Sequence, residues 1–366
     1  MKKIRLALAC AALLTAAGCS HFGYYFQAAH GQFSLMSQAR PISDWLDDPE
    51  TDAKIKNKLE AVQRIRKFAA HELALPENDS YTAYADLKRP YALWNVVATP
   101  ALSMKPKSWC FPVAGCVTYR GYYSKDEAHA YADELRREGY DVRVGGVAAY
   151  STLGWFADPV LSTFIHYPEG ELARLIFHEL AHQIAYAPGD SQFNESFATA
   201  VEEAGVERWL ASEGDPVRRA AYQEFRARKQ QFLALLLSTR AKLDVLYSGS
   251  ETHAEKLRQK AAIFAAMQEE YFVLKASWGG FKGYDRFFAQ PLSNAHLAEI
   301  ATYHAYVPAF RALLVQQESL ASFYASVKTL ASMSNTARSE KMMALSPTAI
   351  QPAASQAAAE SGVFAR

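Results

Sequence analysis

Residues 177–198 read FHELAHQIAYAPGDSQFNESFA, and this stretch predicts two helices joined by a tight turn. His178 and His182 are four positions apart, just over one helical turn, so both imidazoles project from one face of the first helix. The Pro-Gly pair at 188–189 ends that helix and lets the chain reverse. An antiparallel helical pair would bring the first turn of the second helix, with Glu195, back towards the two histidines.

These residue types at this spacing are typical of a zinc site in a hydrolytic enzyme. Catalytic zinc prefers three protein ligands and keeps its fourth position for water, so we predict His178, His182 and Glu195 as ligands and Zn²⁺ as cofactor. Glu179 is rotated by about 100° from the first ligand, within reach of a metal-bound water, and is the predicted general base. Glu202, two turns beyond Glu195, is predicted to accept a hydrogen bond from a ligand histidine.

Composition places the chain among globular proteins. Its 366 residues include 39 basic and 38 acidic side chains, a balance unlike the basic excess of nucleic-acid binders. Aromatic residues make up 13%, enough for a substantial core. We predict one metallopeptidase-like domain over residues 19–334, with a mixed α/β part over about 19–165 and a helical zinc-site part over about 166–334. Residues 335–366, rich in Ala, Ser and Met, are predicted to be a disordered tail.

The first twenty residues have the pattern of a lipoprotein signal peptide. A basic start precedes an apolar run, residues 6–17, that is too short to span a bilayer comfortably. LTAAGC, ending at Cys19, resembles the bacterial lipobox, with Ala16 where Leu is usual. We predict removal of residues 1–18 and lipidation of Cys19, which would anchor the protein stably. The alternative is an ordinary signal peptide with an incidental cysteine. Ser20 after the cysteine favours the outer membrane, with the protein facing the periplasm.

Two further cysteines would stay in the mature chain, Cys110 and Cys116 in CFPVAGC. An oxidising compartment permits a disulfide that closes this small loop. Two buried thiols are the alternative. The spacing fits no common zinc pattern, so we predict no metal there.

Periodicity on either side of the zinc stretch predicts an α+β fold. Before it, a helix is expected over 42–75, followed by strands and one capped helix at 91–100, 117–123, 124–139 and 141–150. After it the chain is overwhelmingly helical, with helices expected over 169–186, 191–212, 215–247, 252–276 and 295–330. The predicted architecture is a small mixed sheet with helices, followed by a mainly α-helical zinc metallopeptidase-like domain.

The segment NESFATAVEE is similar to the NEGFAxxxxE segment of gluzincin aminopeptidases, in which the Glu after Asn is the third zinc ligand. The spacer between His182 and Glu195 is shorter here. Nearly the whole mature chain resembles a family of bacterial lipoproteins catalogued as aminopeptidases. The segments that carry this resemblance are GYYFQAAHGQFSL, RPYALWNVVA, WCFPVAGCVTYRGYY, VGGVAAYSTLGWFADPVLST, LIFHELAHQ and FNESFATAVEEAGVERW. The resemblance implies a membrane-anchored zinc peptidase that hydrolyses peptide substrates.

Recognition of the substrate is less defined by the residues. In gluzincin aminopeptidases a Glu near the position of VGGVAAYSTLG, residues 144–154, binds the free amine, but no acidic residue lies between Asp141 and Asp158 here. Endopeptidase action therefore stays open beside aminopeptidase action. The same segment is a candidate edge strand for peptide addition, or else a buried strand that ends in a turn. Tyr303 and His304 are candidate oxyanion donors, with core packing as the alternative.

A different class of function competes with the peptidase: an envelope lipoprotein with a structural or unproductive zinc site that acts as a binding or assembly factor. The charged helices over 215–276 could form a partner-binding arm. Glu179 argues against this reading, because a structural zinc site needs no general base. Cell-wall peptide is a further substrate alternative that no residue selects. His166, His253 and His296 have no partner spacing and are expected to be structural or solvated.

Overall fold

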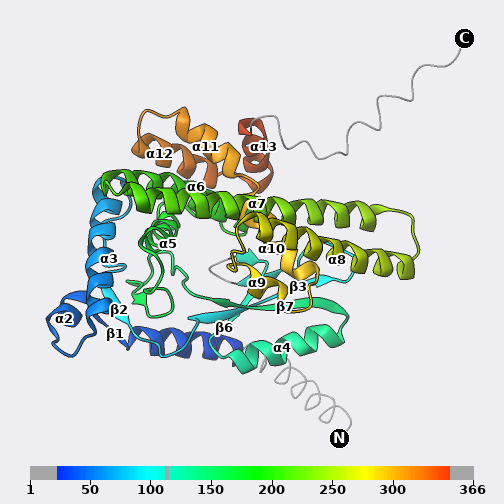
Figure 1. Cartoon of the computed structure of the whole chain (residues 1–366), viewed down its shortest axis with the longest axis horizontal. Helices are drawn as coiled ribbons and strands as arrows, with labels where there is room; N and C mark the ends of the chain where they lie inside the picture. The colour runs from blue at the N-terminus through cyan, green and yellow to red at the C-terminus, as the bar shows by residue number, and fades with distance from the viewer. Residues whose placement is uncertain (1–22, 112–114, 347–366) are drawn as a thin grey trace, which may run out of the picture.

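The computed structural model describes residues 23–111 and 115–346. Residues 23–36 are helical. The strands are β1 (Ala39–Pro41), β2 (Ala83–Ala85), β3 (Leu93–Pro100), β4 (Trp109–Phe111), β5 (Gly115–Val117), β6 (Arg120–Tyr122), β7 (Tyr140–Val147) and β8 (Val160–Leu161). The helices are α2 (Ile42–Asp47), α3 (Ala53–His71), α4 (Lys125–Arg137), α5 (Glu169–Ala181), α6 (Ser191–Ser212), α7 (Pro216–Ser248), α8 (His253–Ser277), α9 (Asp285–Phe288), α10 (Asn294–His304), α11 (Val307–Val315), α12 (Leu320–Ala331) and α13 (Asn335–Leu345). The predicted α+β class is confirmed, with the strands in the first half and a mainly helical second half (Figure 1).

The largest sheet is antiparallel, with strand order β6-β3-β7. β3 and β7 pair along their full length, from Leu93 opposite Val147 to Pro100 opposite Tyr140. Alternate residues of β3 meet apolar residues three or four apart on α4, because a strand repeats every two residues and a helix nearly every four. The buried residues of this layer are Trp94, Val96, Ala98, Ala128, Ala132 and Leu135. α10 packs on the other side of the sheet (Figure 1).

Two smaller sheets complete the strand part. In the first, β2 lies between β1, which is antiparallel to it, and β8, which is parallel. In the second, β4 and β5 form a hairpin that Cys110 and Cys116 join by a disulfide. The residues between β7 and β8 connect the edge of the large sheet to the small sheet that contains β8, and α5 follows β8 in the chain.

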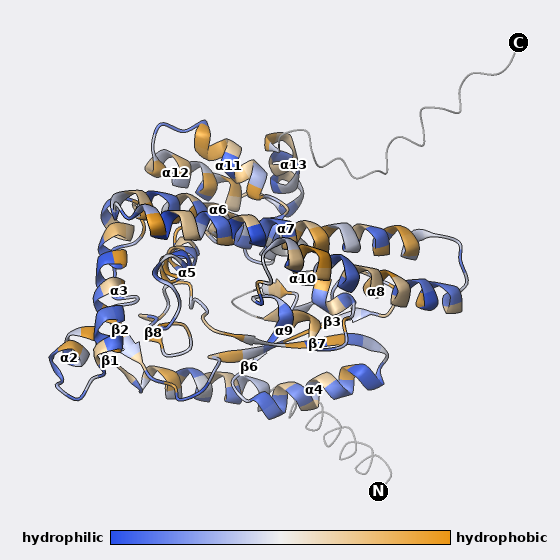
Figure 2. Ribbon diagram, viewed as in Figure 1, coloured by the Kyte–Doolittle hydropathy of each residue, from blue (hydrophilic) through white to orange (hydrophobic). Residues whose placement is uncertain are grey.

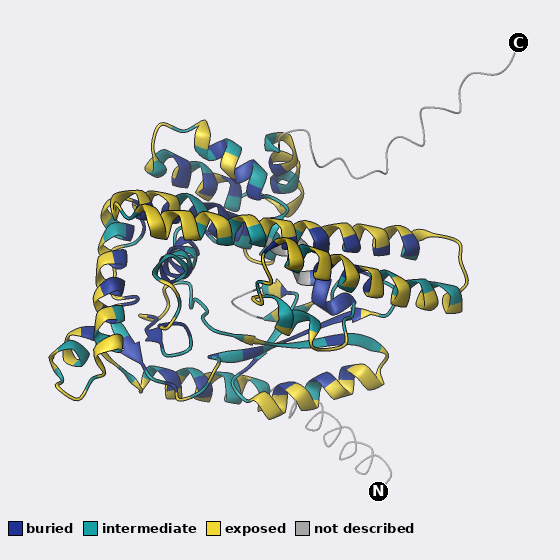
Figure 3. Cartoon of the chain, viewed as in Figure 1, coloured by how far each residue is buried: buried dark blue, intermediate teal, exposed yellow. Residues whose placement is uncertain are grey.

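The helical part is built on α5, which lies inside the molecule. Its residues Leu172, Ala173, Ile176 and Phe177 are fully buried, and Figure 3 shows the helix enclosed by more exposed elements. α6 packs along α5, and α11–α13 cover the outer side of α6 (Figure 1). α7 and α8 form a long antiparallel pair, and each of the two helices carries both polar and apolar residues (Figure 2). This pair has its own apolar core, which includes Leu235, Leu236, Leu243, Phe264, Met267 and Tyr271.

Two of the predicted helices are divided in the structure. The segment 42–75 forms α2 and α3, and the side chain of Asp52 caps the start of α3 by accepting the backbone N–H of Lys54. The segment 295–330 forms α10, α11 and α12. Pro308 lies in the first turn of α11, where a missing N–H costs no helical hydrogen bond, and Ser319 caps α12. The apolar periodicity of the sequence continues across these breaks, so it did not predict them.

The predicted disordered tail is wrong for its first eleven residues, which form α13. Composition favoured disorder, but tertiary contacts order the segment, since Met342 and Arg338 are almost fully buried. Residues 347–366 lie outside the described residues, as do Cys19 and the predicted signal peptide. Within the described ranges, no helix combines the length and apolar character needed to cross a bilayer.

Candidate metal centre

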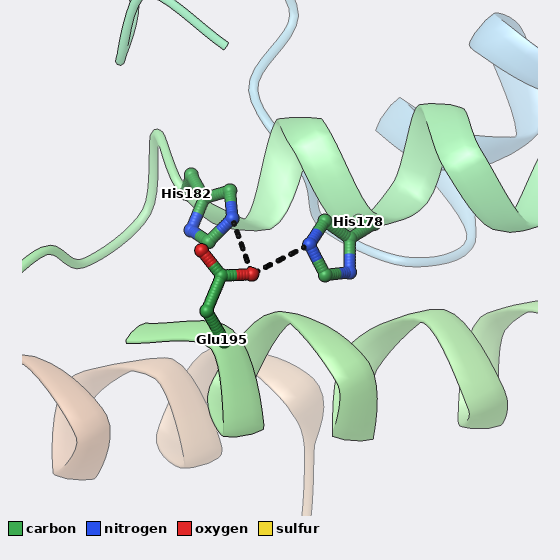
Figure 4. A group of neighbouring side chains, drawn as sticks. All are labelled: His178, His182 and Glu195. Atoms are coloured by element: carbon green, nitrogen blue, oxygen red, sulfur yellow. Dashed lines mark hydrogen bonds and ion pairs between the residues drawn. The ribbon is translucent and has the colours of Figure 1, made fainter. Parts of the chain in front are cut away.

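Three side chains from two helices meet at one point (Figure 4). His178 lies in the last turn of α5, His182 directly follows that helix, and Glu195 lies in the first turns of α6. The Oε2 atom of Glu195 is 3.2 Å from Nε2 of His178 and 3.7 Å from Nε2 of His182. One potential ligand atom from each residue lies within 4.8 Å of the other two. The reversal between the helices thus brings the three predicted ligands together.

A clamp at the turn sets the position of Glu195. Gly189 has a φ of +79°, a left-handed conformation that glycine adopts without steric cost. The buried amide of Asn194 accepts the N–H of Ala187 at 2.8 Å and donates to its carbonyl at 2.9 Å. Both ends of the turn are therefore held by the residue that precedes Glu195, which explains the role of Asn in the NES triplet.

A second brace comes from the far end of the chain. Asp190 caps α6 through one carboxylate oxygen and accepts a 2.8 Å hydrogen bond from Nε of Arg338 through the other. Both side chains are buried. Arg338 also donates to the carbonyls of Ala331 and Met333. α13, in the segment predicted to be disordered, thus supports the turn between α5 and α6.

Behind the three residues, Glu202 fixes the orientation of one histidine. Nδ1 of His178 lies 2.9 Å from Oε2 of Glu202, so an Nδ1–H donates to the carboxylate and the ring directs Nε2 towards Glu195. Arg174 Nη1 lies 2.8 Å from the same oxygen, and Lys229 Nζ lies 3.8 Å from Oε1. The sequence prediction for Glu202 agrees with this position.

Arg174 was not singled out from the sequence, although a signal existed. It precedes His178 by four residues, so the two share a helix face. Its guanidinium bridges Glu171 and Glu202, at 2.8 Å from each. Burial would raise the pKa of Glu202, but Arg174 and the hydrogen bond with His178 hold it well below its usual range. Glu202 is therefore ionised at neutral pH.

The cluster requires positive charge at its centre. Burial would lower the pKa of His178, but hydrogen bonds to Glu195 and Glu202 raise it to about 10. Burial would raise the pKa of Glu195, but His182 and His178 lower it to about 2. A proton on His178 or a divalent cation can supply this charge, and the two compete for the same lone pair.

The donor set and its spacing fit a metal ion. Two ligands on a tetrahedral zinc, each about 2.1 Å from the ion, lie about 3.4 Å apart. The separations of 3.2 Å and 3.7 Å lie on either side of that value. His178, His182 and Glu195 could therefore hold a metal ion.

The three residues lie in the wall of a cavity of 620 Å³. Glu179 lines it too and is almost buried, and its burial raises the pKa of its carboxyl. Across from α5 and α6, the cavity is bounded by residues 147–151 at the end of β7. β7 pairs with β3 on one side and is an edge strand among the described residues, so the edge-strand prediction for residues 144–154 is confirmed as far as Val147, where the strand ends.

Of the two oxyanion candidates, the structure describes the side chain of only His304. His304 lines the cavity, and burial together with the nearby Lys229 lowers its pKa to about 4, so it is neutral at pH 7 and carries an N–H donor. The backbone of Tyr303 belongs to α10, but its side chain lies outside the described residues. Their catalytic role stays a prediction.

No curated protein and no solved structure matches this chain. The model of the family described as "Putative aminopeptidase" matches residues 23–342. This range includes α5, α6, the clamp at the turn and most of α13. The family name indicates peptidase activity on peptide substrates. The chain therefore belongs to the Putative aminopeptidase family, as its sequence segments predicted.

Proposed function

We propose that this protein is a zinc metallopeptidase that hydrolyses peptide bonds and is held at the bacterial envelope by lipid on Cys19. The observation that carries the proposal is the meeting of His178, His182 and Glu195 beside Glu179 in one cavity. Two imidazoles and a carboxylate make zinc the default metal. Family membership supports the peptidase class.

Zinc in this site would polarise the scissile carbonyl and lower the pKa of a bound water towards neutrality. The carboxylate of Glu179 accepts a proton from the attacking water and returns it to the leaving amine. Its burial favours this role, because a raised pKa makes a carboxylate a stronger base. Glu202 keeps His178 in the orientation that directs Nε2 towards Glu195.

The open edge of β7 is the proposed place for the substrate backbone. A peptide that adds to this edge would gain main-chain hydrogen bonds and extend along residues 147–151 towards Glu179. Among the described residues that line the cavity, the carboxylates are Glu179, Glu195 and Glu202, all within the proposed zinc site. A separate carboxylate for the substrate amine is not among them, so the test must distinguish amino-terminal from internal cleavage.

The decisive experiment combines metal analysis with a peptide library. Each peptide is supplied with a free and with an acetylated amino terminus, and Glu179→Gln serves as the control variant. We expect one zinc per chain in both proteins and hydrolysis only by the wild type. Cleavage of the free-amine set alone identifies an aminopeptidase, and cleavage of both sets identifies an endopeptidase. Stoichiometric zinc without cleavage of either set would contradict the peptidase and favour a binding or assembly factor.

A further inference from the structure

The helix over residues 23–36 buries apolar residues such as Leu35, 2% exposed, but also leaves large aromatic residues exposed. Its inward side carries two glutamines: Gln27 bonds the backbone of Gly121 and Tyr123, and Gln32 accepts from the hydroxyls of Tyr123 and Tyr150. Its outward side carries exposed aromatic residues as well as small and polar ones. Surface helices normally place apolar residues inward and charged residues outward.

Two of the exposed aromatic residues lie on one face. Phe26 and Phe33 are seven residues apart, two helical turns, and are 65% and 68% exposed. Tyr25, about 100° around the helix from Phe26, is 45% exposed and its ring meets that of Phe111. Single exposed apolar residues are common in soluble proteins, but these three share a helix without any charged side chain. The sequence contains no Asp, Glu, Lys or Arg between Arg5 and Arg40.

Packing on the inward side prevents the helix from turning these rings inward. A Cβ atom on Gly31 would lie 2.1 Å from the ring of Tyr123, so only glycine permits this approach. At the start of the helix, Tyr24 stacks on Phe111 of the disulfide-closed hairpin, with ring centroids 5.6 Å apart. The aromatic face must therefore point away from the protein.

We propose that the outward face of this helix lies in the interface of a lipid bilayer. Cys19, the proposed lipid attachment site, precedes Gly23 by four residues, which can span about 14 Å at full extension. A lipid on Cys19 therefore holds the start of the helix close to the membrane. Aromatic side chains are favoured at the headgroup level, where an apolar ring meets a polar environment. The proposal rests on the lipid anchor and does not depend on peptidase activity.

This placement defines where the cavity lies. Tyr24 and Ala28, on the inward side of the same helix, line the cavity that contains His178 and Glu195. Because a helix with its side chains is about 10–12 Å across, the side of the cavity that Tyr24 and Ala28 line lies one helix away from the lipid surface. Its substrates are then polypeptides that are attached to the membrane or emerge from it.

The test is site-directed fluorescence quenching in the full-length lipidated protein. Cys110 and Cys116 are joined and Cys19 would carry lipid, so an introduced cysteine is labelled selectively. Phe26→Cys and Phe33→Cys report on the proposed face. Val315→Cys is the matched control, because Val315 is an 86% exposed apolar residue at the end of α11, at the opposite edge of the molecule in Figure 1.

The labelled proteins are reconstituted into vesicles of phosphatidylethanolamine and phosphatidylglycerol that contain nitroxide lipids. We expect quenching at positions 26 and 33 to exceed that at position 315 by at least about twofold. Equal quenching in protein that floats with the vesicles would overturn the proposal, as would protein that does not float at all. Shielding of position 33 that depends on protein concentration without lipid would identify a second copy as the occupant and also overturn it. Peptide hydrolysis by the same samples shows separately whether the proposed function holds.

Discussion

Two antiparallel helical pairs in this molecule bury different kinds of side chain. The α5–α6 pair buries polar and charged groups, including Glu179, His182, Asn194 and Glu202. The α7–α8 pair buries Leu, Phe, Met and Tyr side chains and leaves the ion pair that joins its two helices exposed, since Lys242 and Glu270 are each 48% exposed. Burying charge is costly unless every group is partnered. The first pair therefore has the buried polar groups of a functional site, and the second has the apolar core of a structural support.

The largest contrast is expected from the same Glu→Gln substitution in both pairs. Glu179→Gln should lower kcat by about 10²–10⁴-fold, because the amide cannot accept the proton from water. Zinc content, measured by elemental analysis, should be unchanged. Glu270→Gln on α8 should leave both quantities at wild-type values. Comparable losses of kcat in the two variants would show that the effect does not arise from a general base.

Removing an arginine should destabilise the protein more beside the α5–α6 pair than on the α7–α8 pair. Arg338→Met leaves the buried carboxylate of Asp190 without its cation and should cost about 3–5 kcal/mol in free energy of unfolding. Arg228→Met removes an i,i+4 ion pair with Glu224, whose side chain is 63% exposed. This substitution should cost at most about 1 kcal/mol in free energy of unfolding. Urea denaturation of both variants measures the difference. Equal costs would mean that α13 does not support the turn before α6.

A pH prediction concerns α10, which packs against both α6 and α7. His296 is buried, its Nδ1 accepts the N–H of Ser293 at 3.1 Å, and burial together with Arg143 lowers its pKa to about 4. The folded state thus prefers the neutral imidazole. Its contribution to stability is present above the unfolded pKa of about 6.5 and is lost as pH falls towards 4.

The variant His296→Gln should weaken this dependence. Between pH 7 and pH 4 the wild type should lose up to about 3 kcal/mol more than the variant, because each pKa unit corresponds to about 1.4 kcal/mol. Urea midpoints measured across this range test the expectation. Parallel curves for the two proteins would show that His296 keeps an ordinary pKa in the fold.

The smallest effect is expected for Glu202, which contacts the candidate ligand His178. Glu202→Gln should weaken zinc binding by about 10–100-fold, because the amide no longer orients His178 as a carboxylate does. Glu203→Gln is the matched control, since this neighbouring carboxylate pairs with Arg311 away from the site. Competition with a chelator measures both affinities. Equal affinities would show that Glu202 serves only to neutralise Arg174.

Local sequence was sufficient for much of this fold. Residues 191–212 were predicted as one helix, and α6 has those bounds. Predicted boundaries failed where apolar periodicity ran on across a cap, as at Ser319. They failed again at α13, because composition does not report that Arg338 meets Asp190, a residue 148 positions away. Local propensity is a weak prior that tertiary contacts override.

The sequence by itself determined the candidate metal-ligand set, because four-residue spacing puts His178 and His182 on one helix face whatever surrounds them. It also predicted a reversal of the chain before Glu195, although α5 ends at Ala181 and not at the Pro-Gly pair at 188–189. Only the tertiary structure decided the network around Glu202 and the cavity bounded by β7, because these contacts join segments distant in sequence. Only it showed that the helix over 23–36 turns its aromatic face outward, because periodicity reveals a face but not the direction in which that face points.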